Sequence, residues 1–513
     1  MTAVLPDAGL AVGALWPLYR RSLRAHGADR AIRWEDTEWS YDDVAAAVLG
    51  TARALRDLGV GPRDRVILLA SNGPGCLIGD LAIMAVGAVK VPVSPMLSAA
   101  EVAVIAERVR PACAVVSAEL PTPDGVVRLE IGHGRVAPEA GVHDLLDGFA
   151  GAEPRDPAAI YFSGGTTGEP KGVVHSQQGL VANLWSHVVE AGIGAADVLL
   201  LTTPMAHAAG LFGMVGLLRG ACVRIERRFD PAEFRARVES DGVTWTFAVP
   251  TMINRLVAYA EREDWRPTSL RTVQYGAAPI SAAVLRRALV RFGPVFQQLY
   301  AQTECPNYAT VLSKADHVAA LDRGSLLGSA GRAVLMCEVA VVADDGTVLG
   351  SDTVGEVCLR APYVMAGYWD DVAGYAARFH GDWLRTGDVG YLDAAGYLYL
   401  VDRRNDMIVS GGMNVHSIEV EQAVQAVEGV AAAAVIGIPH PDWGEAVHAV
   451  VVARPGVTGL AERVLAETRS TLATYKRPKT VEVVAELPLT RYGKVDKKAL
   501  RAAHWGDRRR GIN

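Results

Sequence analysis

Residues 161–173 read Tyr161-Phe162-Ser163-Gly164-Gly165-Thr166-Thr167-Gly168-Glu169-Pro170-Lys171-Gly172-Val173. Apolar residues stand at both ends, which predicts strand, loop and strand. The glycines let backbone N–H groups turn inward without a side chain in the way. Successive N–H groups, hydroxyl side chains and a lysine together form a nest for anions. The stretch is therefore expected to bind a polyphosphate.

This loop differs from the Walker A loop, which needs lysine directly after glycine. Here Glu169 and Pro170 separate Gly168 from Lys171. A Gly-Thr-Thr-Gly fragment alone would favour an ordinary surface turn. The whole stretch, however, resembles the phosphate loop of the adenylate-forming superfamily. That superfamily includes acyl-CoA synthetases, aryl- and amino-acid-activating domains, and firefly luciferase.

The length, net charge and cysteine content of the chain agree with a globular protein of more than one domain. The chain has 513 residues, which exceeds a single compact core. Its net charge of −6 argues against a nucleic-acid binder. Six cysteines without a C-x-x-C pair favour a reducing cytoplasm. No signal peptide is visible, and the longest apolar stretch, Leu81 to Val93, is interrupted by Lys90 and too short for a membrane span.

Strand and helix patterns alternate up to about Leu299, which predicts a parallel sheet covered by helices. After Gly324 the pattern becomes antiparallel, and the last hundred or so residues form a smaller unit. The resemblance implies an α/β protein. It has a large N-terminal domain, residues 1–404, of stacked α/β subdomains plus a β-barrel-like part. A small mobile α+β domain follows, residues 405–513.

A second motif, Tyr300-Ala301-Gln302-Thr303-Glu304, follows the predicted strand 295–299. It resembles the Tyr-Gly-x-Thr-Glu motif of the superfamily, with Ala301 in place of the usual glycine. The resemblance implies that Tyr300 stacks on adenine and Thr303 binds a phosphate. It also implies that Glu304 holds Mg²⁺, a cation that prefers carboxylate and phosphate oxygens.

The acid pocket is inferred from the segment around His207, which in the family lines the pocket beside the reacting carboxylate. Ala208 stands where amino-acid-activating relatives carry an aspartate, so an α-amino acid substrate is not expected. A lone histidine is usually structural, and core packing explains the same apolar residues as a pocket would. The expected pocket residues are His207, Ala208, Leu211, Phe212, Phe247, Tyr275 and Gly276, and the turn expected beside adenine is Gly276, Ala277 and Ala278.

Two later motifs complete the expected nucleotide and thiol sites. Asp388, in Trp383 to Asp388, resembles the family's ribose-binding aspartate, and Arg403 would also contact ribose. Asn405 occupies the hinge position, where Asp or Lys is usual. Gly411 and Gly412 would let the backbone approach the pantetheine thiol.

The last motif contains Thr490 and, three residues on, Gly493-Lys494. A lysine in a polar loop is by default surface charge. The terminal position resembles the catalytic lysine loop of the family. Lys494 would bridge the carboxylate and the α-phosphate and stabilise negative charge.

The resemblance, over about residues 10 to 500, implies an acyl- or aryl-CoA synthetase that uses ATP, Mg²⁺ and coenzyme A. The expected acid is apolar, aryl or medium-chain. One alternative loads an acyl carrier protein instead of CoA, and a second performs only one half-reaction. A third is a nucleotide-binding module without catalysis. A luciferase is formally possible, but no motif favours it.

Overall fold

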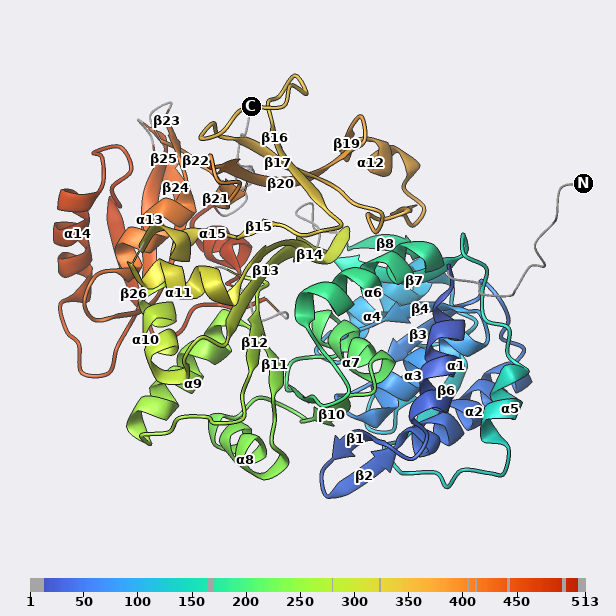
Figure 1. Cartoon of the computed structure of the whole chain (residues 1–513). Coiled ribbons are helices and arrows are strands. Elements are labelled where there is room, and N and C mark those ends of the chain that lie inside the picture. Colours follow the sequence, from blue (N-terminus) through green and yellow to red (C-terminus); the bar gives the residue numbers. More distant parts are fainter. Residues whose placement is uncertain are drawn as a thin grey trace, which may run out of the picture.

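The computed structural model of the protein describes residues 13–163, 170–278, 280–322, 324–403, 406–410, 413–440, 443–490 and 495–505. In this part of the chain the strands form four sheets, shown in Figure 1. Two large sheets come mainly from the first two thirds of the chain. An antiparallel sheet follows, and the fourth sheet belongs to the C-terminal unit, here residues 406–505. No described helix has the length and apolar character needed to cross a membrane.

The first large sheet has the strand order β18-β8-β7-β4-β3-β5-β6. Strands β3 to β6 pair in parallel, whereas β7 and β8 form an antiparallel pair. The strands are β3 (Arg65–Leu69), β4 (Val89–Pro92), β5 (Cys113–Ser117), β6 (Arg128–Ile131), β7 (Pro157–Ser163), β8 (Lys171–Ser176) and β18 (Gly367–Tyr368).

The second large sheet has the order β15-β14-β13-β12-β11-β9-β10-β1-β2, and its centre is parallel. The predicted parallel sheets are thereby confirmed. The strands are β1 (Arg30–Trp34), β2 (Thr37–Ser40), β9 (Val198–Leu201), β10 (Cys222–Ile225), β11 (Trp245–Ala248), β12 (Thr272–Tyr275), β13 (Phe296–Gln302), β14 (Cys305–Leu312) and β15 (Arg332–Ala333).

The remaining sheets are largely antiparallel, and for the third sheet this confirms the pattern predicted after Gly324. In the third, β20 lies between β17 and β21 and also pairs with β19; in the fourth, β25 pairs with β22, β24 and β26. Their strands are β16 (Glu338–Val342), β17 (Gly355–Arg360), β19 (Phe379–His380), β20 (Trp383–Leu392), β21 (Leu398–Arg403), β22 (Ile408–Ser410), β23 (Met413–Val415), β24 (Val430–His440), β25 (Gly444–Ala453) and β26 (Thr480–Val484).

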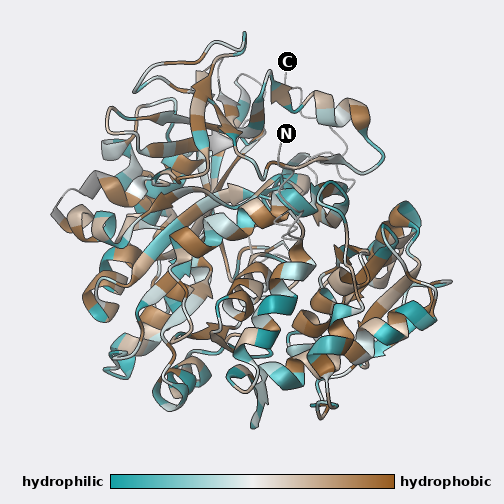
Figure 2. Ribbon diagram, turned by 45° about the vertical axis from the view of Figure 1, so that its right-hand side comes forward, coloured by the Kyte–Doolittle hydropathy of each residue, from teal (hydrophilic) through white to brown (hydrophobic). Residues whose placement is uncertain are grey.

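The helices cover the sheets, and Figure 2 shows hydrophilic residues on their outer sides. Those of the two large sheets are α1 (Leu15–His26), α2 (Tyr41–Asp57), α3 (Pro74–Ala85), α4 (Ala99–Val109), α5 (Val142–Asp147), α6 (Gln177–Ala191), α7 (Ala208–Leu218), α8 (Pro231–Asp241), α9 (Pro250–Arg262), α10 (Ala282–Phe292) and α11 (Lys314–Asp322). The later helices are α12 (Val372–Ala376), α13 (Ser417–Gln425), α14 (Leu460–Thr471) and α15 (Lys497–Trp505).

Several helices begin at a residue whose side chain caps the first turn. The Ser40 hydroxyl accepts from the Asp43 amide at 3.1 Å, and the Asp43 carboxylate accepts from the Ser40 amide at 2.8 Å. The side chains of Asp230 and Ser281 cap α8 and α10 by accepting hydrogen bonds from backbone N–H groups. These side chains satisfy N–H groups that have no partner inside the helix. The helix starts are therefore decided locally.

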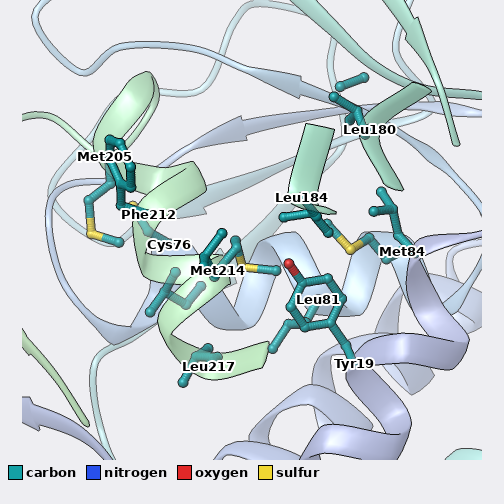
Figure 3. Close-up of a cluster of buried hydrophobic side chains, with 14 of the residues drawn as sticks. Tyr19, Cys76, Leu81, Met84, Leu180, Leu184, Met205, Phe212, Met214 and Leu217 are labelled. Atoms are coloured by element: carbon teal, nitrogen blue, oxygen red, sulfur yellow. The ribbon is translucent and has the colours of Figure 1, made fainter. Parts of the chain in front are cut away.

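The largest hydrophobic cluster joins the two large sheets. Figure 3 shows Tyr19 of α1, Leu81 and Met84 of α3, Leu184 of α6 and Phe212 of α7 converging in it. These residues are buried, and their apolar surface supplies most of the driving force for this packing. Helix α7 thus connects the core to the segment that precedes it, which contains His207.

Three histidines are buried in their neutral form. Burial lowers the pKa of His175, His187 and His317 to about 4 in each case. The His187 ring shows the reason: Nδ1–H donates to Asn183 O at 2.8 Å, and Nε2 accepts from Asn307 Nδ2 at 2.8 Å. A protonated ring could not keep both bonds. The native fold therefore disfavours the charged state.

Because these histidines are buried, we expect acid to destabilise the protein at pH values well above those at which its carboxylates titrate. An unfolded histidine titrates near pH 6.5, so the unfolded state binds more protons than the native state between about pH 6.5 and 4. The stabilising contribution is complete above about pH 6.5 and is lost as the pH falls to about 4, up to about 3 kcal/mol for each histidine. Urea unfolding at pH 7 and pH 5 measures the loss. His187→Gln is expected to reduce the pH dependence, whereas Val181→Ala, which removes no titrating group, should lower stability equally at both pH values.

Candidate active site

The two strands that flank the glycine-rich loop form an antiparallel pair in which Ser163 lies opposite Lys171. The pairing confirms the predicted strands and brings both ends of the loop to one place. Gly164, Gly165, Thr166, Thr167 and Gly168 lie outside the described residues, as does the Ser163 side chain. Their phosphate-binding role stays a prediction.

Lys171 is connected through Tyr368 to the second motif. Its Nζ lies 5.0 Å from the centroid of the Tyr368 ring and 3.7 Å from the Asp371 carboxylate. The Tyr368 hydroxyl donates to Glu304 Oε1 at 2.8 Å. The fold therefore places Lys171 and Glu304, which are 133 positions apart in the sequence, on two sides of one aromatic side chain.

Glu304 is 9% exposed and held by several contacts. Its carbonyl accepts from the Met365 amide at 2.8 Å, and Arg378 Nη2 lies 3.5 Å from Oε1. The second carboxylate oxygen, Oε2, makes no hydrogen bond with the described residues. A charged oxygen with an open position fits the preference of Mg²⁺ for carboxylate ligands.

His175 orients the same motif from the neighbouring sheet. Its Nε2–H donates to the Thr303 carbonyl at 2.9 Å, and the low pKa keeps the ring neutral at pH 7. Sequence reasoning missed His175, Tyr368 and Arg378. His175 could have been suspected, because it is on the same strand as Lys171, four positions further. The other two lie between motifs and carry no local signal.

Tyr300 and Asp388 form the next pair. The Tyr300 hydroxyl donates to Asp388 Oδ2 at 2.6 Å, and Asp388 is directly opposite Arg403 in the β20–β21 pair. The predicted strand 295–299 was too short: β13 continues to Gln302 because β14 pairs with it, Tyr300 opposite Thr310. The fold brings the expected adenine- and ribose-binding residues together. The Arg403 side chain lies outside the described residues.

The turn after β12 is tightly constrained. A Cβ at Gly276 would lie 2.6 Å from the Leu299 carbonyl oxygen, so no larger residue fits there without a shift. Ala277 adopts φ +70°, a left-handed conformation that costs an alanine about 1–2 kcal/mol. Backbone strain of this kind is concentrated at functional sites. This turn ends β12, next to the strand that carries Tyr300.

The expected pocket residues separate into two groups. His207 and Leu211 line a small cavity. The centre of a water molecule can occupy about 20 Å³ of it, which is enough for one water. Phe212 and Phe247 instead pack together in the core with ring centroids 5.2 Å apart, and Tyr275 donates to His317 Nε2 at 2.8 Å. Ala208 is half-buried at the start of α7.

A buried charge pair also lines this cavity. Asp80 and Lys90, each 6% exposed, line it together with Tyr161, and Asp80 Oδ2 accepts from Lys90 Nζ. Burial lowers the pKa of Lys90, but Asp80 and Tyr161 raise it by more, so the ammonium stays charged. Asp80 Oδ1 is buried and has no hydrogen-bond partner among the described residues. Sequence reasoning noted Lys90 only as an interruption of an apolar stretch.

The remaining predicted site residues are not described: Asn405, Gly411, Gly412 and Lys494. The residues that flank Lys494 are described. Leu489 and Val495 form an antiparallel bridge, and the Asp496 amide donates to the Pro488 carbonyl at 2.8 Å. The segment with Lys494 thus starts and ends at paired backbone. The proposed domain boundary between residues 404 and 405 also lies outside the described residues and stays a prediction.

Comparison with known proteins decides the family. The sequence model described as AMP-binding enzyme matches residues 19–369, more than half of the chain. The chain belongs to the AMP-binding enzyme family. The model of the AMP-binding enzyme C-terminal domain matches residues 419–494, within the C-terminal unit. The superfamily resemblance seen in the sequence is thereby confirmed.

Relatives of this AMP-binding enzyme include a ligase, a synthase and a synthetase. The medium/long-chain-fatty-acid–CoA ligase FadD8 of Mycobacterium tuberculosis is 37% identical over 69% of this chain, but the match spans only 62% of that protein. The feruloyl-CoA synthase of an Amycolatopsis species is 35% identical over 95% of this chain and 98% of that protein. The solved structure of amide bond synthetase McbA from Marinactinospora thermotolerans has a TM-score of 0.84 at 30% identity, covering 96% of this chain and 99% of that chain.

Proposed function

We propose that this AMP-binding enzyme joins a carboxylic acid to the thiol of coenzyme A with the consumption of ATP. The observation that carries the proposal is the contact chain Lys171–Tyr368–Glu304 beside the Tyr300–Asp388 pair. Together these residues supply cationic, carboxylate and aromatic groups for the binding of one nucleotide. A feruloyl-CoA synthase that is similar over nearly the whole chain supports the CoA acceptor.

The first step forms the acyl adenylate. A carboxylate oxygen of the acid attacks the α-phosphorus of ATP, and the bond from that phosphorus to the pyrophosphate oxygen breaks. Lys171 and the glycine-rich loop bind phosphate oxygens, while Tyr300 and Asp388 position the nucleoside. Lys494 stabilises the negative charge that develops between acid and α-phosphate. Most of the rate enhancement comes from positioning and charge.

Glu304 is the residue that fits Mg²⁺ at this site. Its carboxylate would supply one anionic ligand, and a bound Mg²⁺ would neutralise phosphate charge. Tyr368 and Arg378 hold the Glu304 side chain in place, and His175 holds the Thr303 backbone beside it.

The second step transfers the acyl group. The thiol sulfur attacks the acyl carbon, AMP leaves with the electron pair of the broken C–O bond, and the thiol proton passes to solvent. Rotation of the small domain at Asn405 removes Lys494 and brings Gly411 and Gly412 toward the thiol. The two family models match residues 19–369 and 419–494, which supports a boundary between them.

The lining of the cavity beside His207, which has room for one water in this structure, supports an acid with an apolar body and a hydrogen-bonding group. Leu68, Leu77 and Leu211 contribute apolar lining, and Lys90 with Asp80 contributes charged lining. A buried charge pair costs several kcal/mol in desolvation unless its remaining valences are satisfied. A substrate hydroxyl can donate to Asp80 Oδ1, the oxygen that the protein leaves without a partner. Ala208 offers no charge for an α-ammonium group, which disfavours α-amino acids.

The first experiment is pyrophosphate–ATP exchange with phenolic, unsubstituted aromatic and medium-chain acids, followed by thioester detection with CoA. Exchange together with thioester formation is expected. If exchange occurs without thioester, but an amide forms when an amine is added, the acyl acceptor is an amine and not CoA. Exchange without either product would point to a carrier-protein thiol. The absence of exchange for every acid would contradict the proposed adenylation.

A double variant tests the charged lining of the pocket. Asp80→Leu combined with Lys90→Met replaces the buried pair by apolar side chains, a change that often leaves stability unaltered or raised. The wild type is expected to prefer a phenolic acid over its deoxy analogue by about tenfold or more in kcat/KM, and the double variant should lose this preference. Single replacement of Lys90 is the less useful control, because it leaves Asp80 charged and buried. An unchanged preference in a folded double variant would mean that the pair is only structural.

A further inference from the structure

Outside the candidate active site, the C-terminal unit brings together two histidines and a glutamate. His448 is on β25, Glu482 on β26 and His504 on α15. Strands β25 and β26 are parallel, with His448 opposite Thr480, so Glu482 is on the same face two residues further along. One ligand atom from each of the three residues lies within 4.8 Å of the others.

His448 presents a nitrogen that the protein does not use. The residue is 5% exposed, and its Nδ1 lies 2.6 Å from the Thr480 hydroxyl. With Nδ1–H donating to Thr480, the lone pair is on Nε2. That buried Nε2 has no hydrogen-bond partner among the described residues and lies 3.6 Å from Glu482 Oε2. An unpaired buried nitrogen is costly, which argues for a ligand at this position.

His504 reaches the same point because α15 is anchored along its length. Lys497 Nζ is 2.8 Å from the Glu421 carboxylate, and Arg501 Nη1 is 2.8 Å from the Asp406 carboxylate. The Trp505 indole donates to the Gly437 carbonyl at 2.9 Å. These contacts place His504 Nε2 3.8 Å from Glu482 Oε2, with its ring centroid 4.7 Å from that of His448.

The distances between these three side chains fit a bound cation better than a cluster of ion pairs. Neither histidine makes a hydrogen bond to Glu482, because both nitrogen–oxygen distances exceed hydrogen-bond length. In a tetrahedral site with metal–ligand bonds of about 2.0–2.2 Å, ligand atoms are about 3.3–3.6 Å apart. The distances of 3.6 and 3.8 Å to the shared carboxylate oxygen need only small side-chain rotations.

We propose that His448, Glu482 and His504 form a binding site for a divalent transition-metal ion of the zinc class. Two imidazoles and one carboxylate are ligands that Zn²⁺ accepts, and a water completes the fourth position. Thr480 fixes the His448 tautomer from behind, as outer hydrogen-bond partners do in metal sites. The ion connects α15 to β25 and β26. Helix α15 begins three residues after Lys494 in the sequence, so the metal stabilises the end of the chain that follows the catalytic lysine.

The test uses the untagged full-length protein after treatment with a chelator. Titration with Co²⁺ is expected to give one bound ion per chain with the visible d–d absorption of a low-symmetry N/O site, and Zn²⁺ is expected to displace it. Zn²⁺ alone should raise the thermal midpoint of the C-terminal transition. His504→Ala and Glu482→Gln, both at partly exposed positions, should each weaken Zn²⁺ binding by about 100-fold or more, while the metal-free variants stay folded.

Two further variants show whether binding depends on this cluster in particular. Thr480→Val keeps the shape of the side chain but removes the Nδ1 partner, and it should lower affinity by about 10- to 100-fold. His440→Gln changes another histidine of the same unit and should leave binding unaltered. The proposal would be overturned by the absence of Co²⁺ absorption in the folded wild type. It would equally be overturned by Zn²⁺ binding that persists in both His504→Ala and Glu482→Gln.

Discussion

Replacement of Lys494 by alanine is expected to lower pyrophosphate–ATP exchange by about 10²- to 10³-fold, the usual loss when one charge-stabilising donor is removed from a transition state. The same variant should still convert synthetic acyl-AMP and CoA into thioester at close to the wild-type rate. The reason is that Lys494 acts on charge at the α-phosphate only while the adenylate forms. The two half-reactions are measured separately, with radiolabelled pyrophosphate and with thioester detection.

Lys498→Ala provides the matched control for Lys494, because it removes a nearby lysine at the start of α15. It is expected to leave both half-reactions within about twofold of the wild type. Equal losses in the two half-reactions of Lys494→Ala would contradict the assignment. Such a result would mean that Lys494 supports the fold of the C-terminal unit or acts in both steps.

Glu304→Gln is expected to lower exchange by about 10²-fold and to raise the Mg²⁺ concentration needed for half-maximal rate. Glutamine keeps the size of the side chain and still accepts the Tyr368 hydroxyl bond at Oε1, but it loses the negative charge. High Mg²⁺ should restore part of the activity, because the amide oxygen remains a weak ligand. Initial rates over a Mg²⁺ series at fixed ATP measure the effect.

Tyr368→Phe separates the charge of Glu304 from its orientation. Removal of the phenol oxygen deletes the 2.8 Å hydrogen bond but leaves the carboxylate and the ring beside Lys171. A loss of about tenfold or less is expected, with little change in the Mg²⁺ requirement. If Glu304→Gln and Tyr368→Phe were to show the same Mg²⁺ requirement as the wild type, Glu304 would have a structural role only.

Local sequence signals were sufficient to predict helices and strands and to indicate the family. Ser40 with Asp43, Asp230 and Ser281 each cap the start of a helix, and such a cap needs only residues within one turn. The glycine-rich stretch predicted strand, loop and strand, and the motifs from Tyr161 to Lys494 indicated the superfamily. Strand ends were less accurate: β13 extends to Gln302 because its partner β14 continues the pairing.

The tertiary structure alone decided which side chains serve the predicted motifs. His175 reaches Thr303 across 128 positions, and Tyr368 reaches Glu304 across 64. The same holds for Asp80 with Lys90 at the cavity beside His207, and for His448 with Glu482 and His504. Periodicity and motif spacing describe short segments of chain. Contacts such as these depend instead on the order and register of strands within a sheet, which are decided when the whole hydrophobic core packs.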